Sequence, residues 1–122
     1  MKEYLVFDWG GTFLKYALTD EEMNINEQGK VPAPSRYGTK EEFLAVIDSI
    51  VMPRLERISG IAVSSPGILD SEKGIIHVVG VFPYLNGFHL KEEFEERYRC
   101  PASLENDGKS AALAEQIGRA HV

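Results

Sequence analysis

The pattern of apolar residues changes once along the chain, close to Pro32 and Pro34, and this change limits the possible folds. Before it come three short runs of strand-forming residues, at Tyr4–Phe7, Phe13–Leu18 and Met23–Val31. Consecutive strands that are joined by short links favour an antiparallel meander. After it, helical and strand-like patterns alternate to the end of the chain. This order predicts an α/β fold with a mixed sheet.

The first predicted helix follows the prolines and runs from Thr39 to about Met52. Thr39 and Glu42 have the spacing of a capping box, and apolar residues recur at helical spacing as far as Ile50. Pro53 then ends the helix, because proline cannot continue one. The other predicted elements are a strand at Ile58–Ser64, a short strand at Ile75–Val79, a helix at Leu90–Tyr98, a strand at Pro101–Leu104 and a helix at Asp107–Gln116.

Composition excludes several classes of protein. The 122 residues carry 19 acidic and 13 basic side chains, a formal net charge of -6, which argues against non-specific binding of nucleic acid. No apolar run approaches the about 20 residues that a membrane span needs, so no membrane association is predicted. Cys100 is the single cysteine, which rules out an internal disulfide and fits a reducing, cytoplasmic location. We interpret Cys100 as an apolar filler and not as a nucleophile.

The stretch FDWGGTFLKYAL places several polar residues in one bend between two predicted strands. Gly10 and Gly11 can adopt positive φ, and successive N–H groups in such a bend form a concavity that suits anions. The Thr12 hydroxyl and the Lys15 ammonium could contact phosphate oxygens, and the Asp8 carboxylate could hold Mg²⁺. A plain hairpin with two glycines at its tip explains the same stretch equally well.

Asn106 and Asp107 stand at a predicted strand–helix junction, in the stretch LENDGKSAALAE. Asp107 suits a helix N-cap, which needs no catalytic explanation. It could also act as a general base, since a carboxylate with a pKa of about 3.9 is ionised at neutral pH. Asn106 has donor and acceptor groups that suit a sugar hydroxyl. Two further loops, Pro66–Gly67 and Asn86–Gly87, could present backbone groups to a ligand, although simple turns are the commoner cause of such pairs.

In this order, the stretches DWGGTFLK, SSPGILD, the Asn86–Gly87 loop and ENDGKSAALAE resemble the N-terminal domain of the ROK family (repressors, open reading frames, kinases). This family includes bacterial sugar kinases related to glucokinase and fructokinase, and the resemblance covers the chain from Met1 to about Glu115. It implies an actin-like, ribonuclease-H-like ATPase fold in which two lobes hold a nucleotide and a sugar between them. ATP and Mg²⁺ are the implied cofactors, and the parent protein could be a homodimer.

The resemblance also implies roles for particular residues. Asp107 would be the catalytic base. The residues of the first nucleotide-phosphate-binding element would be Asp8, Gly10, Gly11, Thr12 and Lys15. The sugar-binding residues would be Pro66, Gly67, Asn86, Gly87, Asn106 and Asp107.

The chain departs from the family pattern at a few positions. Trp9 is bulky where an aliphatic residue is usual, and Gly108 and Lys109 replace the common alanine and asparagine after Asp107. Many members carry a zinc site of one histidine and three cysteines in the second lobe. The single cysteine and three scattered histidines of this chain have no such ligand spacing, so no metal site of that kind is predicted.

The last six residues, 117–122 (IGRAHV), resemble the in-frame translation of a sequencing-library adapter. We therefore hypothesise a truncated gene product in which residues 1–116 are the N-terminal kinase lobe, residues 117–122 are not native and the C-terminal lobe is absent. Such a fragment would have little activity alone. A genuine helix end with Gly118 as its C-cap is the alternative.

Three functions agree with these features. The leading hypothesis is ATP-dependent phosphorylation of a sugar hydroxyl. The second is the sugar-sensing domain of a ROK transcriptional regulator that lacks its helix-turn-helix. The third is a non-catalytic actin-like domain that binds a nucleotide or a partner, for which a base at Asp107 would have no use. The sequence leaves the identity of the sugar open.

Overall fold

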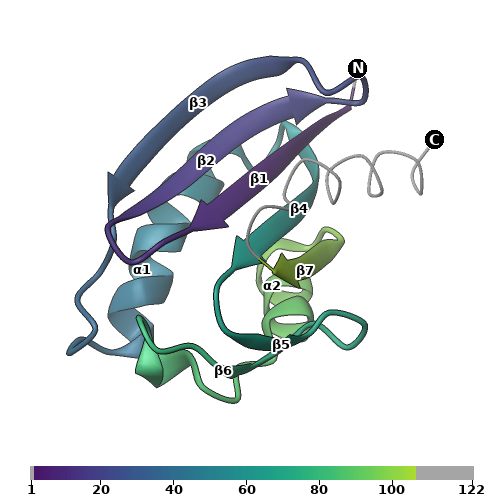
Figure 1. Cartoon of the computed structure of the whole chain (residues 1–122). Coiled ribbons are helices and arrows are strands. Elements are labelled where there is room, and N and C mark those ends of the chain that lie inside the picture. Colours follow the sequence, from purple (N-terminus) through teal and green to yellow (C-terminus); the bar gives the residue numbers. More distant parts are fainter. Residues whose placement is uncertain (1, 107–122) are drawn as a thin grey trace.

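The computed structural model describes residues 2–106, and these form a five-stranded sheet, a two-stranded sheet and two α-helices (Figure 1). The strand order of the larger sheet is β3-β2-β1-β4-β7. The predicted helix at Asp107–Gln116 and the tail at 117–122 lie outside the described residues. Within residues 2–106, both α-helices are too short to cross a bilayer.

The three leading strands form the antiparallel meander that the sequence predicts. They are β1 (Glu3–Trp9), β2 (Phe13–Asp20) and β3 (Ile25–Pro32). The register places Asp8 opposite Lys15 and Lys15 opposite Lys30. Cross-strand partners lie on the same face of an antiparallel sheet, so these three side chains share one face near the β1–β2 turn.

The second half of the sheet is parallel. Its elements are α1 (Lys40–Val51), β4 (Ile58–Ser65), α2 (Leu90–Tyr98) and β7 (Ala102–Asn106), close to their predicted bounds. β4 pairs in parallel with β1 on one side and with β7 on the other, which confirms the mixed sheet. Thr39 caps α1 as predicted, because its Oγ1 accepts a hydrogen bond from the Glu42 backbone N–H over 3.1 Å.

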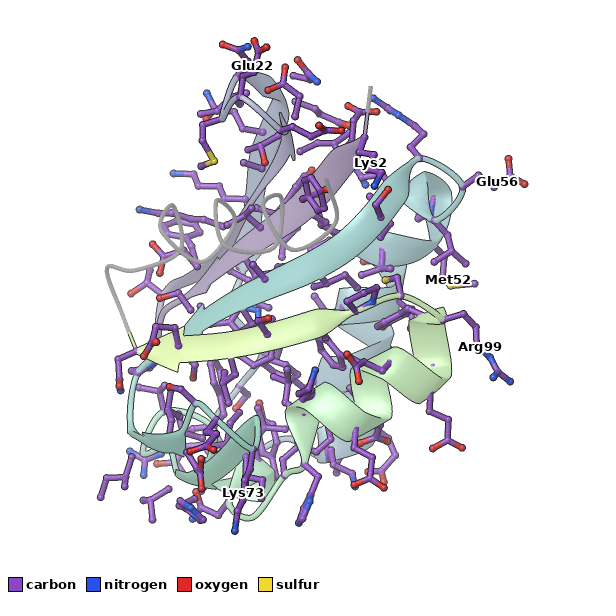
Figure 2. The ribbon with its side chains drawn as sticks, turned by 90° about the vertical axis from the view of Figure 1, so that its right-hand side faces the viewer. Lys2, Glu22, Met52, Glu56, Lys73 and Arg99 are labelled. Carbon is purple, nitrogen blue, oxygen red and sulfur yellow. The ribbon has the colours of Figure 1, made fainter. Side chains whose placement is uncertain are left out.

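A small two-stranded sheet extends from the end of β4. It consists of β5 (Ile68–Asp70) and β6 (Ile75–Val78), and only β6 was predicted. β5 has three residues, too few to show the alternation by which a strand is recognised. Two short 3₁₀ turns, Met52–Arg54 and Pro83–Leu85, complete the described elements. Figure 2 shows the two ends of the molecule, with Glu22 in the β2–β3 turn and Lys73 in the β5–β6 turn.

The main core lies between the sheet and the two helices, on one face of the sheet (Figure 1). Trp9, which is 1% exposed, packs edge-to-face against Phe43 of α1, with ring centroids 4.9 Å apart. The ring of Phe94 in α2 also packs edge-to-face against this indole, with ring centroids 6.3 Å apart. Each such aromatic pair contributes about 0.5–1.5 kcal/mol beyond the area that it buries. The bulky residue at position 9 therefore fixes the end of β1 to both helices.

The face of the sheet opposite the helices is buried and mostly apolar at one end, and exposed and charged at the other. Far from the β1–β2 turn, Tyr4, Val6 and Ala62 form a small buried cluster. Nearer the turn, the side chains of Asp8, Lys15 and Lys30 on the same face are exposed. The sheet thus brings an exposed group of charges to the end at which β1 and β4 terminate.

Candidate functional site

The β1–β2 turn consists of Gly10, Gly11 and Thr12, and backbone hydrogen bonds hold it closed. The Gly10 N–H donates to the Phe13 carbonyl oxygen over 3.0 Å. The Thr12 carbonyl oxygen accepts from the Ala33 N–H over 2.9 Å, which joins the turn to the segment after β3. The turn is therefore a fixed part of the sheet edge.

Gly10 and Gly11, which can adopt positive φ, do not do so here. Among the described glycines, only Gly67, Gly74 and Gly87 have positive φ. At position 11 a Cβ would lie 3.0 Å from Cγ1 of Val81, a contact close enough that one of the two groups would have to move. The three-residue turn reverses the chain without left-handed geometry, and the loop after β6 approaches it closely.

A cavity of about 220 Å³ lies beside this turn. Its lining residues are Asp8, Gly10, Gly11, Thr12, Phe13 and Lys15. The structure therefore brings together the five residues that the sequence predicts for phosphate binding. Asp8 and Lys15 are direct cross-strand partners, yet no ion pair joins either side chain to another described residue. Both charges are available to a ligand.

A second cavity of about 360 Å³ continues from the first along the same face of the sheet. Asp8 and Lys15 line both cavities, and Lys30 of β3 lines the second. The Lys30 Nζ atom lies 4.2 Å from the centre of the Phe13 ring, a cation–π distance. Sequence reasoning missed Lys30. The signal that could have found it is strand alternation combined with the β2–β3 register.

Asn106 ends β7 and is tied to two neighbouring segments. Its backbone carbonyl oxygen accepts a hydrogen bond from Ser64 Oγ over 3.0 Å. Its Nδ2 donates to the Gly67 carbonyl oxygen over 3.2 Å, so two of the predicted sugar-binding positions are in direct contact. Asp107, the predicted catalytic base, lies outside the described residues.

The Pro66–Gly67 and Asn86–Gly87 loops contact the same segment after β6. Gly67 has φ of +108°, and a Cβ there would overlap the Val78 carbonyl oxygen, so no other residue fits. Asn86 Oδ1 accepts a hydrogen bond from the Val79 N–H over 2.8 Å, which commits this oxygen to the fold of its own loop. The cavity of about 260 Å³ beside Asn86 and Gly87 is lined by residues from 84–89 together with Lys40 and Glu93, and not by the Pro66–Gly67 loop or Asn106.

The glycine turn and Asn106 lie along one edge of the sheet. β1, β4 and β7 run in parallel, and the register places Asp8 beside Ser64 and Ser64 beside Glu105. Neighbouring strands are about 4.8 Å apart, so β1 and β7 are separated by about 10 Å at this edge. The geometry thus places the glycine turn and Asn106 at the same end of the sheet, about two strand spacings apart.

The described residues can hold Mg²⁺ in one way. Within residues 2–106, no group of three or more His, Cys, Asp or Glu side chains is arranged to bind a metal ion. Mg²⁺ in phosphate-transferring sites usually binds to one or two carboxylates and to the phosphates of the substrate, and it keeps several waters. The exposed Asp8 carboxylate beside the turn cavity fits that arrangement.

Cys100 does not fit a nucleophilic role. Burial, together with the Glu95 carboxylate, raises the pKa of its thiol to about 11. The thiol is therefore protonated at neutral pH, and the thiolate is the reactive form. This agrees with the interpretation of Cys100 as an apolar filler.

Comparison with protein families gives a match over nearly the whole chain. The model of the ROK family matches residues 4–121. A beta-glucoside kinase of Listeria innocua is 31% identical over 112 residues, which are 90% of this chain and 36% of that protein. The transcriptional repressor Mlc of Escherichia coli is 31% identical over 64 residues, 52% of this chain and 16% of the repressor.

Solved structures with the same fold include members of this family. The Lmo2764 protein of Listeria monocytogenes superposes with a TM-score of 0.80 at 28% identity, covering 98% of this chain and 40% of that one. A ROK family glucokinase of Streptomyces griseus, in complex with glucose and AMPPNP, gives a TM-score of 0.74 at 25% identity, covering 90% of this chain and 35% of that one. The chain thus spans 36% of the length of the beta-glucoside kinase and 40% of that of the Lmo2764 protein.

Proposed function

The chain belongs to the ROK family, and from this premise we propose that it is the N-terminal lobe of a kinase that transfers a phosphoryl group from ATP to a sugar hydroxyl. The observation that carries the proposal is the shared sheet edge. On it, the glycine turn with Asp8 and Lys15 lies about two strand spacings from Asn106. The beta-glucoside kinase and the glucokinase among the relatives support the same reaction class.

The turn residues would hold the phosphate donor. The Gly11 backbone N–H and the Thr12 hydroxyl are hydrogen-bond donors beside a cavity that Lys15 also lines, whereas the Gly10 N–H is bonded within the turn. Mg²⁺ held by Asp8 would neutralise charge on the phosphates. Phosphoryl transfer depends mainly on positioning and charge neutralisation, which these groups would supply on this lobe's side of the cleft.

The acceptor side would be built around Asn106 and Asp107. Asn106 is fixed by its bond to the Gly67 carbonyl oxygen and would contact the sugar next to the Pro66–Gly67 loop. Asp107 would accept the proton of the attacking sugar hydroxyl. A bond then forms between that oxygen and the terminal phosphorus while the bond from phosphorus to the bridging oxygen of ATP breaks. The product nucleotide leaves as ADP.

The sugar that is phosphorylated is expected to be a hexose or a glucoside. The beta-glucoside kinase and the glucokinase, whose structure contains glucose, support this substrate class. The Asn86–Gly87 loop, which lines a separate cavity, would take part only in the outer wall of the sugar pocket.

The test is a phosphorylation screen across sugars with the full-length protein that contains this chain, beside the variant Asp107→Asn. The variant keeps the size of the side chain and removes the base, so kcat for the preferred sugar should fall by about 100-fold or more. Wild-type turnover in the variant would contradict the mechanism. The 122-residue chain alone should have little activity, because the opposite wall of the cleft would come from a second lobe.

A sugar-sensing domain of a transcriptional regulator is the second candidate. The match to the repressor Mlc favours it, although that match covers 52% of this chain. The two functions differ in turnover. A sensor would bind its sugar and release it unchanged in the presence of ATP, whereas a kinase would consume ATP in proportion to the sugar phosphate that it forms.

A further inference from the structure

Two lysines stand side by side on the exposed face of the hairpin. Lys15 of β2 and Lys30 of β3 are direct cross-strand partners, and both are exposed. Like charges in directly opposed positions destabilise a sheet. Neither ammonium has an anionic partner among the described residues, so the arrangement points to an anion that lies over both.

The surroundings of Lys30 hold its ammonium close to the glycine turn. Nζ lies 4.2 Å from the centre of the Phe13 ring. Phe13 follows Thr12 directly and lines the turn cavity, whereas Lys30 lines the adjoining cavity of about 360 Å³. Lys15 lines both. The cation–π contact restrains a long, flexible side chain at the boundary between the two cavities.

The charge balance of this face favours an anion. Among the described residues that line the two cavities, the charged side chains are the two lysines and one carboxylate, Asp8. No ion pair joins any of the three to another described residue. The chain as a whole has a net charge of -6, so a local excess of positive charge is not a result of composition.

We propose that Lys30 is a second phosphate-binding cation, which acts with Lys15 to hold the terminal phosphoryl groups of the phosphate donor. The inference rests on the proposed function, since it takes the glycine turn to be the seat of those phosphates. Lys30 recognises the phosphate chain itself, whether it belongs to a nucleotide or to an inorganic oligophosphate. A point charge on a flexible stem has no preference between the two.

The experiment measures binding and not turnover. The full-length protein is titrated with magnesium tripolyphosphate and, separately, with magnesium ATP, in the absence of sugar. The variants are Lys30→Met, which removes the charge and keeps the length of the side chain, Lys30→Arg, which keeps the charge, and Lys73→Met as a matched control. Lys73 is an exposed lysine in the β5–β6 turn, distant from the glycine turn (Figure 2).

Lys30→Met should weaken the binding of both phosphate probes by about tenfold, as expected for the loss of one charge-assisted contact. Lys30→Arg should stay within about threefold of wild type, and Lys73→Met within about twofold, because a distant exposed charge is screened by salt. The thermal midpoint of unliganded Lys30→Met should not fall, since the variant removes a like-charge pair.

Three results would overturn the role of Lys30. The first is an affinity of Lys30→Met for both probes that equals that of wild type. The second is an equal loss of affinity in Lys30→Met and Lys73→Met. The third is a Lys30→Met variant that loses affinity for ATP and keeps its affinity for tripolyphosphate. Absence of binding of either probe to the wild-type protein would also overturn it. A protein that binds both probes but phosphorylates no sugar contradicts the proposed kinase activity, and in that case the binding comparison still decides the role of Lys30.

Discussion

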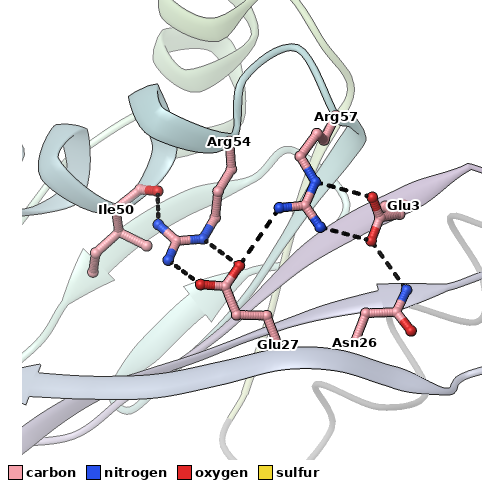
Figure 3. A network of polar contacts seen from close by, with 6 residues as sticks. All are labelled: Glu3, Asn26, Glu27, Ile50, Arg54 and Arg57. Carbon is pink, nitrogen blue, oxygen red and sulfur yellow. Dashed lines mark hydrogen bonds and ion pairs between the residues drawn. The ribbon is translucent and has the colours of Figure 1, made fainter.

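The meander of β1, β2 and β3 carries a group of charged residues at each of its ends, and the two groups differ in whether their charges are paired. At the end far from the glycine turn, Glu3, Asn26, Glu27, Arg54 and Arg57 form a network that we call the paired cluster (Figure 3). At the other end, Asp8, Lys15 and Lys30 form what we call the turn cluster, in which no ion pair joins any of the three to another described residue.

In the paired cluster every guanidinium meets a carboxylate. Arg54 binds Glu27 through two nitrogens and also donates to the Ile50 carbonyl oxygen over 2.7 Å. Arg57 Nε donates to Glu3 Oε1 over 3.2 Å, and Asn26 Nδ2 donates to Glu3 Oε2 over 3.0 Å. The cluster joins the edge strand β3 to the end of α1 and to the start of β1.

The difference teaches how a structural use of charge can be told from a functional one. In the paired cluster, the charged side chains form ion pairs that hold parts of the fold together. In the turn cluster, the charged side chains have no ion-pair partner among the described residues, which leaves them available to a ligand. Charged groups that persist without partners beside a cavity are therefore the better candidates for a binding site. We therefore expect substitutions in or beside the turn cluster to act mainly on catalysis and binding, and substitutions in the paired cluster to act on stability.

The largest effect is expected in the turn cluster. Asp8→Asn removes the carboxylate that would hold Mg²⁺, so kcat of the full-length protein should fall by about 100-fold. The thermal midpoint should stay at the wild-type value, because Asp8 makes no ion pair with another described residue. A variant that loses stability and keeps its kcat would show that Asp8 serves the fold and not the reaction.

The next effect is expected in the paired cluster. Arg54→Met should lower the free energy of unfolding by about 1.5 kcal/mol, since it removes the hydrogen bonds of a guanidinium whose side chain is 14% exposed, to Glu27 and to the Ile50 carbonyl oxygen. Denaturant unfolding measures this loss. The affinity for tripolyphosphate should not change. Arg36→Met is the matched control, because Arg36 is exposed and makes no ion pair with a described residue.

A smaller effect is expected from the backbone of the turn. In Gly11→Ala the new Cβ would lie 3.0 Å from Val81 Cγ1, so either the Val81 side chain or the turn shifts by a few tenths of an ångström, and we expect a cost of about 1 kcal/mol and about fivefold in phosphate affinity. Gly80→Ala is the control, because a Cβ at position 80 meets no atom within 4 Å. Adding Val81→Ala to Gly11→Ala should restore the affinity. If it does not, the contact with Val81 is not the reason for glycine at position 11.

The smallest effect is the pH dependence of the paired cluster. The hydrogen bonds from Arg54 lower the pKa of Glu27, and those from Asn26 and then Arg57 lower the pKa of Glu3. A depressed carboxyl pKa contributes stability above the unfolded value of about 4.3, and this is lost as the pH falls through the folded pKa. Solvent screening keeps the contribution small.

Thermal unfolding measured between pH 5 and pH 3 tests this pH dependence. The decline in the thermal midpoint with falling pH should be shallower for Glu27→Gln than for wild type. The same decline in both proteins would show that Glu27 carries none of the dependence.

Local patterns in the sequence were enough to predict most of the fold. The change of periodicity near Pro32 predicted the meander and the helices and strands that alternate after it. The spacing of Thr39 and Glu42 predicted the start of α1. β5 was missed because three residues carry no pattern of their own. It forms because the turn at residues 71–74, in which Gly74 has φ of +70°, folds it back against β6 as a hairpin.

The candidate site could be predicted where its residues are neighbours in the sequence. The turn residues from Asp8 to Lys15 line one cavity, as the motif led us to expect. Lys30 and the paired cluster could not be found in this way, since Lys30 faces Lys15 only through the β2–β3 register and Arg57 reaches Glu3 across 54 residues. The close approach of Val81 to position 11 could not be found in this way either, since the loop after β6 reaches the glycine turn only in the folded chain.

Because β4 lies between β1 and β7, the distance from the glycine turn to Asn106 is set by the spacing of hydrogen-bonded strands. Backbone hydrogen bonds set that spacing, so it does not depend on the identity of the side chains. The loops beyond the strand ends, such as the one around Asn86, can therefore differ in sequence while the separation between the glycine turn and Asn106 stays constant. Under the proposed function, substitutions in these loops could change the preferred sugar without altering the sheet that positions the two sites.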